Sequence, residues 1–187
     1  MMGPSAADLA QYKPRAPAGV LELNINDQWR GIWIDADELP EDAPVFFAYA
    51  LVYKGDKAYV TRPRGSDESW RTVEGDLKEG ETPEDFVRRA SYEMTGAKVE
   101  HIELVGFLEC KATSQNKDFP AGSITVRPIY IAAAKAVEDV PDDSGFERRR
   151  LRLNEHSKAI RDRYPEIDDY MVKAMQRYAV LQASGQV

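Results

Sequence analysis

The chain has 187 residues, of which 43% are hydrophobic and 30% charged, and its formal net charge is -7. This length suits one globular domain better than two, and the negative charge argues against a nucleic-acid partner, because such binding depends on lysine and arginine at phosphates. Cys110 is the only cysteine, which excludes an internal disulfide and a cysteine metal cage. No apolar run is long enough to span a membrane and the first 19 residues hold no signal-peptide core, so we expect a cytoplasmic protein with no membrane partner.

The N-terminal segment is predicted to be an arm that precedes a single domain. Residues 1–19 are rich in Ala, Pro and Gly, so we expect a flexible arm there and one domain over residues 20–187. Trp29 and Trp33 are four residues apart, which indicates core or dimer packing more than base stacking. Alternating apolar residues predict short strands at residues 20–25 and 31–34.

The next segment is predicted to form a hairpin. Residues 44–53 are an almost continuous apolar run, which is typical of a strand buried on both faces. A tight turn at residues 54–56 returns the chain along residues 57–62 as the partner strand. A polar loop at residues 62–69 then leads to Trp70.

Three more strands are predicted in the second half. Residues 99–111 indicate a long strand with a bulge near Gly106. Residues 123–134 indicate another strand, in which Pro128 favours an edge position or a bulge. The alternation in RRRLRL, which starts at Arg148, indicates a last strand with its leucines facing inwards.

Two helices are predicted near the C-terminus. Asn154 is a good N-cap for a helix over residues 155–163, and Pro165 suits the first turn of a terminal helix. The apolar stripe of that terminal helix comprises Ile167, Tyr170, Met171, Ala174, Met175, Tyr178 and Val180 or Leu181. Strands mixed with a few helices predict an α/β sandwich.

The segment from Gly75 to Ala97 has the layout of a loop followed by a helix. Thr82 and Pro83 form a helix start with proline in the first turn, and the helix is predicted to end near Thr95. Five residues, Gly75, Glu81, Arg89, Glu93 and Gly96, are spaced as in the Nudix box, and Trp70 precedes them as an aromatic residue often does in that family. The segment therefore resembles a Nudix box.

This resemblance implies an α/β/α sandwich with a mixed β-sheet, and a Mg or Mn cofactor that box glutamates hold against a diphosphate substrate. Two of those glutamates are replaced, by Ala90 and Met94. Neither side chain offers the hard oxygen ligand that magnesium requires, and their i, i+4 spacing makes one helix face apolar. Of the catalytic and metal-binding positions, the resemblance leaves Glu81 and Glu93, and it implies a structural ion pair between Arg89 and Glu93.

Substrate contacts are predicted beside the box. Arg62, Arg64 and Arg71 can bind phosphates bidentately, with Gly75 in the phosphate-facing loop, although plain solvation explains these arginines equally well. The acids that could replace a lost metal ligand are Glu74, Asp76, Glu79, Asp118, Asp142, Asp143 and Glu147, and surface solvation is again the alternative. The isolated side chains His101, His156 and Cys110 are predicted to be structural.

Three functions remain open at this stage. The first is a Nudix-fold protein that binds a nucleotide or other diphosphate-containing ligand and has lost or weakened Mg-dependent pyrophosphohydrolase activity. The second is an active hydrolase of a nucleoside diphosphate derivative that uses Glu81, Glu93 and a relocated loop carboxylate. The third is a non-catalytic interaction or regulatory module. We also expect a homodimer formed through the N-terminal strands.

Overall fold

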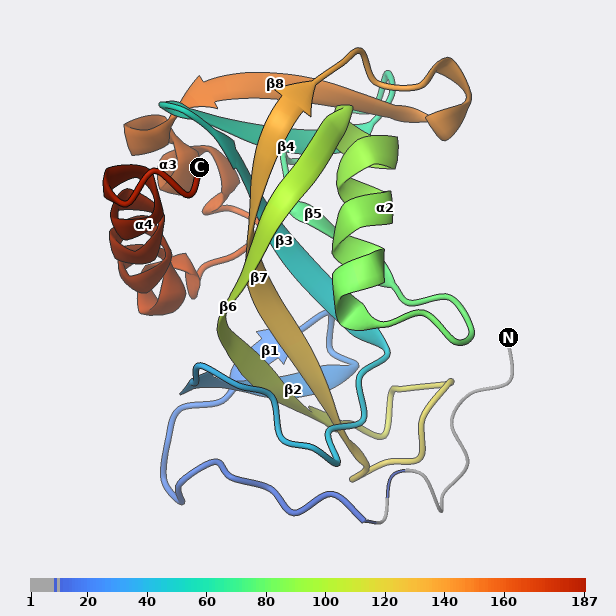
Figure 1. The fold of residues 1–187 in the computed structure, drawn as a ribbon. Helices are drawn as coiled ribbons and strands as arrows, with labels where there is room; N and C mark the ends of the chain where they lie inside the picture. Colours follow the sequence, from blue (N-terminus) through green and yellow to red (C-terminus); the bar gives the residue numbers. More distant parts are fainter. Residues whose placement is uncertain (1–8, 10) are drawn as a thin grey trace.

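A computed structural model describes residue 9 and residues 11–187. A twisted sheet forms the centre of the molecule, with the helix α2 on one face and the helices α3 and α4 on the other (Figure 1). The strands are β1 (Leu23–Ile25), β2 (Trp29–Asp35), β3 (Phe47–Lys54), β4 (Lys57–Pro63), β5 (Val73–Asp76), β6 (Ala97–Ala112), β7 (Ile124–Val137) and β8 (Phe146–Arg152). The helices are α2 (Pro83–Thr95), α3 (His156–Ile160) and α4 (Ile167–Ala183), with 3-10 turns at Asp142–Ser144 and Leu153–Glu155.

The sheet is mixed. Its order is β1-β2-β6-β7-β3-β4-β8, and β5 pairs with β3 beside this path. The central pair β3 and β7 is parallel, whereas β2 with β6 and β3 with β4 are antiparallel. This arrangement confirms the predicted α/β sandwich with a mixed sheet.

Strand β3 is buried on both faces, as predicted. Its side chains alternate between two cores: Ala48, Ala50 and Val52 pack towards α2, and Tyr49, Leu51 and Tyr53 pack towards α3 and α4. Small side chains on the α2 side let the helix lie close to the sheet, while the large side chains fill the opposite layer. The position of α2 over the N-terminal half of β3 brings the helix next to β5.

Helix α2 has the boundaries that the sequence predicts. The Thr82 hydroxyl accepts a hydrogen bond from the backbone N–H of Asp85, and the Asp85 carboxylate accepts one from the backbone N–H of Thr82, so the N-terminus carries a capping box. Gly96 ends the helix with φ of 74°, and a Cβ there would meet the Glu138 carbonyl oxygen at 2.2 Å. The helix therefore needs glycine at this cap.

The long strand β6 contains the predicted bulge. Its pairing with β7 shifts register between Leu104 and Gly106. A side chain at Gly106 would lie 2.3 Å from the Trp33 ring, so this position must be glycine for β2 to pack across it. Trp33 is partly buried and packs on Tyr170, with ring centroids 5.3 Å apart. Trp29 is buried in the core, which agrees with the core alternative of the prediction for that residue.

The sequence predicts an edge position or a bulge at Pro128. The edge is wrong, because β7 lies in the middle of the sheet between β6 and β3, whereas the β6–β7 ladder does shift register beside it, opposite Ile129 and Tyr130. Proline is tolerated there because it falls in a gap of the β3 ladder, between the isolated Val45–Val126 bridge and the first regular pair, Tyr49–Ile129. Strand β5 lies where only a loop was expected, because four residues with two acids carry little β pattern.

The C-terminal helices agree in part with the prediction. The cap at Asn154 is wrong, because this residue lies inside a 3-10 turn and the five-residue helix α3 starts after it. The stripe of α4 is confirmed by the burial of Tyr170, Met171, Ala174, Tyr178 and Leu181, whereas Val180 is exposed. The side chain of Ile167 lies outside the described residues. In the part of the chain that the structure describes, no helix is both long and apolar enough to cross a membrane.

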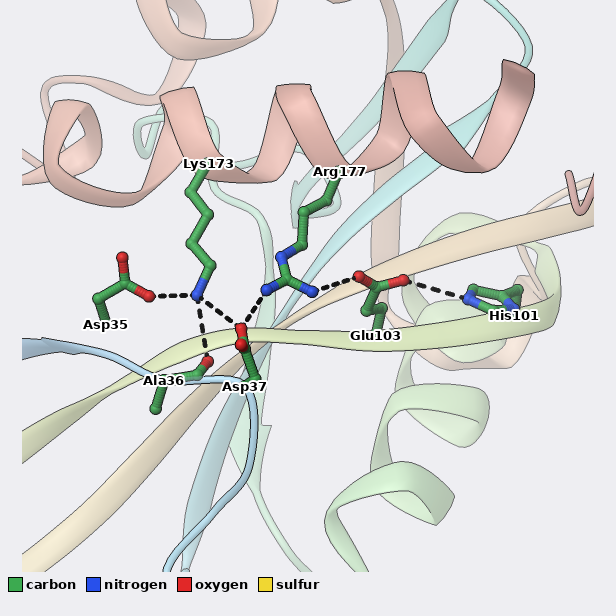
Figure 2. A network of polar contacts seen from close by, with 7 residues as sticks. All are labelled: Asp35, Ala36, Asp37, His101, Glu103, Lys173 and Arg177. Carbon is green, nitrogen blue, oxygen red and sulfur yellow. Dashed lines mark hydrogen bonds and ion pairs between the residues drawn. The ribbon is translucent and has the colours of Figure 1, made fainter. Parts of the chain in front are cut away.

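Charged side chains tie α4 to the sheet (Figure 2). Lys173 contacts Asp35 and donates to Asp37 at 3.2 Å. Arg177 also contacts Asp37 and donates to Glu103 on β6 at 2.8 Å. These contacts fix α4 across β2 and β6 on the side opposite α2.

The described part of the N-terminal segment contacts β6. The Tyr12 hydroxyl donates to the Glu109 carboxylate at 2.7 Å, and the backbone N–H groups of Arg15 and Ala16 donate to the same carboxylate. Burial is the main reason, with Glu109 the next, that the pKa of Tyr12 lies well above its ordinary value. Residues 1–8 and 10 of the predicted arm lie outside the described residues.

Candidate functional site

A cleft of about 500 Å³ opens where β5, β7, the end of α2 and the segment between α3 and α4 meet. Its charged lining residues are Arg71, Glu74, Asp76, Asp118, Arg127, Arg163 and Glu166. Its aromatic lining residues are Trp29, Phe46, Phe47, Tyr49, Phe119, Phe146 and Tyr164, and Gly75 and Met94 also reach it. The lining of the cleft is thus partly charged, with both signs present, and partly aromatic.

Arg89 joins two glutamates of the box, Glu81 and Glu93. Arg89 donates from Nε and Nη2 to both oxygens of Glu81, at 2.6 and 2.8 Å, and from Nη1 to Glu93 at 3.0 Å. The backbone N–H of Lys78 adds a bond of 2.8 Å to Glu81. The hydrogen bond from Arg89 is the main reason that the pKa of Glu81 is lowered. Both glutamates are therefore held as partners of Arg89.

The cleft receives Met94 and not the box glutamates. Met94 lines it, whereas Glu81 and Glu93 are not among its lining residues. Ala90 is fully buried in the core between α2 and the sheet, at 0% exposure. In the described part of the chain, no three carboxylate, histidine or cysteine side chains converge as a metal site would require. The residues of the box therefore do not fit the divalent metal that the resemblance implies.

The predicted substrate arginines separate into two groups. Arg71 and Gly75 line the cleft. Arg62 donates to Glu147 at 2.5 Å and stacks 4.3 Å above the Trp70 ring, and Arg64 donates to carbonyl oxygens of the loop that precedes β8. The structure brings only the first pair to the candidate site.

Glu74 is a buried acid at the centre of a polar cluster in the cleft. Its carboxylate accepts from Arg163 Nε at 2.9 Å and from the Tyr164 hydroxyl at 2.6 Å, and Arg71 lies 3.7 Å away. Burial and then the charge of Glu74 raise the pKa of Tyr164 well above its ordinary value. Of the other acids singled out in the sequence, Asp76 and Asp118 line the cleft, whereas Glu79, Asp142, Asp143 and Glu147 do not.

Arg127 lies in the cleft, and the sequence analysis missed it. It is 8% exposed, and its guanidinium carbon lies 4.7 Å from the centroid of the Phe47 ring and 5.0 Å from that of Trp29. Its Nη1 donates to the Tyr49 hydroxyl at 3.3 Å. Arg127 is the only charged residue in the apolar strand sequence ITVRPIYIAAA, and this isolated charge is the signal that could have revealed it.

Two other predicted structural residues are buried. His156 is fully buried, and its Nδ1 lies 3.2 Å from the Tyr53 hydroxyl. Cys110 is fully buried as well, and burial raises the pKa of its thiol to about 11. Neither residue lines the cleft.

A mixed sheet between helices, with a cleft beside the C-terminal end of α2, places the protein in the class of α/β sandwiches. The NUDIX domain family matches the chain over residues 43–174, and the chain belongs to that family. No curated protein matches the chain significantly.

Solved structures of this fold class resemble the chain at low sequence identity. A mutant of a Bacillus subtilis pyrophosphohydrolase is 19% identical, with a TM-score of 0.55 over 71% of this chain and 77% of that one. A NUDIX hydrolase from Nitrosomonas europaea is 18% identical, with a TM-score of 0.54 over 71% of this chain and 89% of that one. At such identity the likeness concerns the fold.

Proposed function

We propose that the protein binds a nucleotide or another diphosphate-containing ligand in this cleft, with its Mg-dependent or Mn-dependent pyrophosphohydrolase activity lost or weakened. The observation that carries the proposal is the position of Met94 at the cleft, next to Glu93, which is bound to Arg89 at 3.0 Å. A thioether is a poor ligand for a hard cation, and a carboxylate already paired with arginine gains little from one.

The cationic side chains of the cleft support binding of phosphate. Arg71, Arg127 and Arg163 line it and come from three separate parts of the chain. A guanidinium group can donate two parallel hydrogen bonds to the oxygens of one phosphate, and it remains charged at any working pH. The aromatic residues of the lining supply flat apolar surface for a ring, and edge-to-face contacts hold Phe119 against Trp29 and Phe46.

An active hydrolase is the second candidate, and Asp76 and Asp118 favour it. Both line the cleft, and neither takes part in an ion pair among the described residues. A metal held by these acids and by substrate phosphates would need no box glutamate. In this version Glu81 and Glu93 serve only to brace the box, which differs from the roles that the sequence implies for them.

Calorimetric titration with ADP, ATP and ADP-ribose, first in EDTA and then with Mg²⁺ or Mn²⁺, tests the proposal together with product-release assays. We expect binding in EDTA and no turnover with either metal. Robust hydrolysis of any of these compounds would contradict the non-hydrolytic function and support the second candidate, with Asp76→Asn and Asp118→Asn as the variants to assay. Failure of every compound to bind would favour the interaction-module alternative.

We also propose that the protein forms a homodimer through the segment before β1. Leu21 is 86% exposed and Val20 is 43% exposed, and β1 is at the edge of the sheet. An exposed apolar pair beside an open strand edge is a suitable contact for a second copy. Light scattering should give a dimer mass for the wild type and a monomer mass for Leu21→Glu; a monomeric wild type would contradict it. The cytoplasmic location stays a prediction.

A further inference from the structure

Arg127 is a buried cation whose hydrogen-bonding capacity is largely unused. A guanidinium carries five N–H donors, and among the described residues Arg127 makes one hydrogen bond, to the Tyr49 hydroxyl. No carboxylate in the described part of the chain lies within ion-pair distance of it. Burying a charge without a paired anion is costly, so its place in the cleft requires an explanation.

The neighbouring groups do not supply the missing anion. Glu74 is the acid whose charge Arg127 senses, but its two oxygens are already bound by Arg163 and Tyr164. Cys110 lies near and is neutral, because its burial disfavours the thiolate. Tyr49 is a neutral hydroxyl whose ionisation is disfavoured by burial. The surrounding elements β3, β5 and β6 therefore leave Arg127 without a counter-charge of its own.

Aromatic rings position the guanidinium. Phe47 from β3 and Trp29 from β2 lie against it, and such contacts stabilise a cation while they cover its faces. Arg127 lines the cleft, and apart from the bond to the Tyr49 hydroxyl its N–H groups make no hydrogen bond among the described residues, so they can donate to an acceptor there. An arginine held in this way is ordered before a ligand arrives, so less side-chain entropy is lost on binding.

We propose that Arg127 anchors a phosphate group of the ligand by donating two N–H bonds to its oxygens inside the cleft. This inference rests on the proposed function, which places a diphosphate-containing ligand there. It assigns the strongest phosphate contact to β7, far in sequence from Gly75 and the box. Arg71 and Arg163 differ from Arg127 because both lie close to Glu74.

Titration calorimetry and thermal unfolding with inorganic pyrophosphate and with ADP, both in EDTA, test this inference. The variants are Arg127→Met, Arg127→Lys and, as a matched control, Arg150→Met, which removes an exposed arginine on β8. We expect Arg127→Met to bind both compounds about 10- to 100-fold more weakly, the usual effect of losing hydrogen bonds to a charged group. Arg127→Lys keeps the charge but cannot donate two parallel hydrogen bonds, so it should bind with intermediate affinity. Arg150→Met should bind as the wild type does.

A purely structural role would give a different set of results. If Arg127 served only packing, Arg127→Met would unfold at a lower temperature without ligand and keep its affinity. The inference predicts the reverse: the same or higher unfolding temperature without ligand, because a buried charge is gone, and loss of the shift that pyrophosphate causes. Unchanged affinity of Arg127→Met would overturn the inference and leave the proposed function standing. A wild type that binds neither compound would overturn both.

Discussion

Met94 reaches the cleft, whereas Glu93, one residue earlier on α2, turns to Arg89 at 3.0 Å. One residue of rotation on a helix thus separates a side chain that faces the ligand space from one that braces the box. This relationship suggests that a carboxylate placed at position 94 would enter the cleft directly.

The variant Met94→Glu should therefore gain affinity for Mn²⁺. A new carboxylate there joins Asp76, which also lines the cleft, and two hard oxygen donors hold a divalent ion better than one. Electron paramagnetic resonance of free Mn²⁺ measures the bound fraction, and we expect at least about tenfold tighter binding than in the wild type. The neutral isostere Met94→Gln is the control, and equal binding by both variants would contradict the prediction.

Ala90→Glu should fail where Met94→Glu succeeds. Ala90 is completely buried between α2 and the sheet, so a glutamate there must bury a charge or displace the helix. We expect a loss of stability of about 3 kcal/mol or more, seen as a lower midpoint in urea. The control Ala90→Leu adds similar bulk without charge, so it separates the effect of crowding from that of charge. A stable Ala90→Glu variant that binds Mn²⁺ would contradict the prediction, because it would show that this face of α2 can accept a carboxylate.

Arg89→Met should destabilise the protein by leaving Glu81 without its partner. The Glu81 side chain is 10% exposed and accepts two of the three Arg89 hydrogen bonds, so its charge is left largely buried when the arginine is removed. We expect a loss of about 2 kcal/mol, and calorimetry should show the unfolding temperature fall by roughly 4 to 8 °C. Arg161→Met breaks an exposed pair with Asp168 and should change little.

The sequence predicts the elements of the fold whose pattern is local. The apolar run that becomes β3 and the cap residues Thr82 and Gly96 define their elements without reference to distant residues. Strand β5 and the position of Pro128 in the sheet depend on pairing partners far along the chain, and a local sequence pattern does not predict those partners. The spacing of the motif indicates the family, because the intervals between its residues reflect which of them share a face of the helix.

The candidate site was only partly predictable for the same reason. Arg71, Gly75 and Met94 lie in or beside the box, and the sequence singles them out. Arg127 and Arg163 come from β7 and from the segment before α4, and they reach the cleft only through the strand order. The motif that identifies the family thus predicts the residues of one wall of the cleft and does not predict those of the other walls.

Stability should fall below pH 6.5 because of His156. Burial lowers the pKa of His156 from 6.5 to about 4, so the folded protein keeps this ring neutral while the unfolded chain takes up a proton. The unfolded state then binds more protons between these two values, and the free energy of unfolding falls by about 1.4 kcal/mol per pH unit as the pH drops. Urea unfolding at pH 7.5 and 5.0 should differ by about 2 kcal/mol from this residue alone. His156→Gln should lose that part of the difference, and an unchanged difference would contradict the assignment.

Glu74→Gln should loosen the segment between α3 and α4 and weaken the cleft wall that it forms. In the wild type this carboxylate binds both Arg163 and the buried hydroxyl of Tyr164, so it ties residues 161–166 to β5. The amide keeps an acceptor for Tyr164 but removes the charge opposite Arg163, and a pair that loses one charge leaves the other uncompensated. Hydrogen exchange should become faster at residues 161–166, by about tenfold for each 1.4 kcal/mol lost, while exchange in α2 stays unchanged. Glu166→Gln, on the same segment, is the matched control because its carboxylate makes no ion pair among the described residues. Equal exchange in the wild type and Glu74→Gln would mean that packing around Tyr164 holds the segment without the charge.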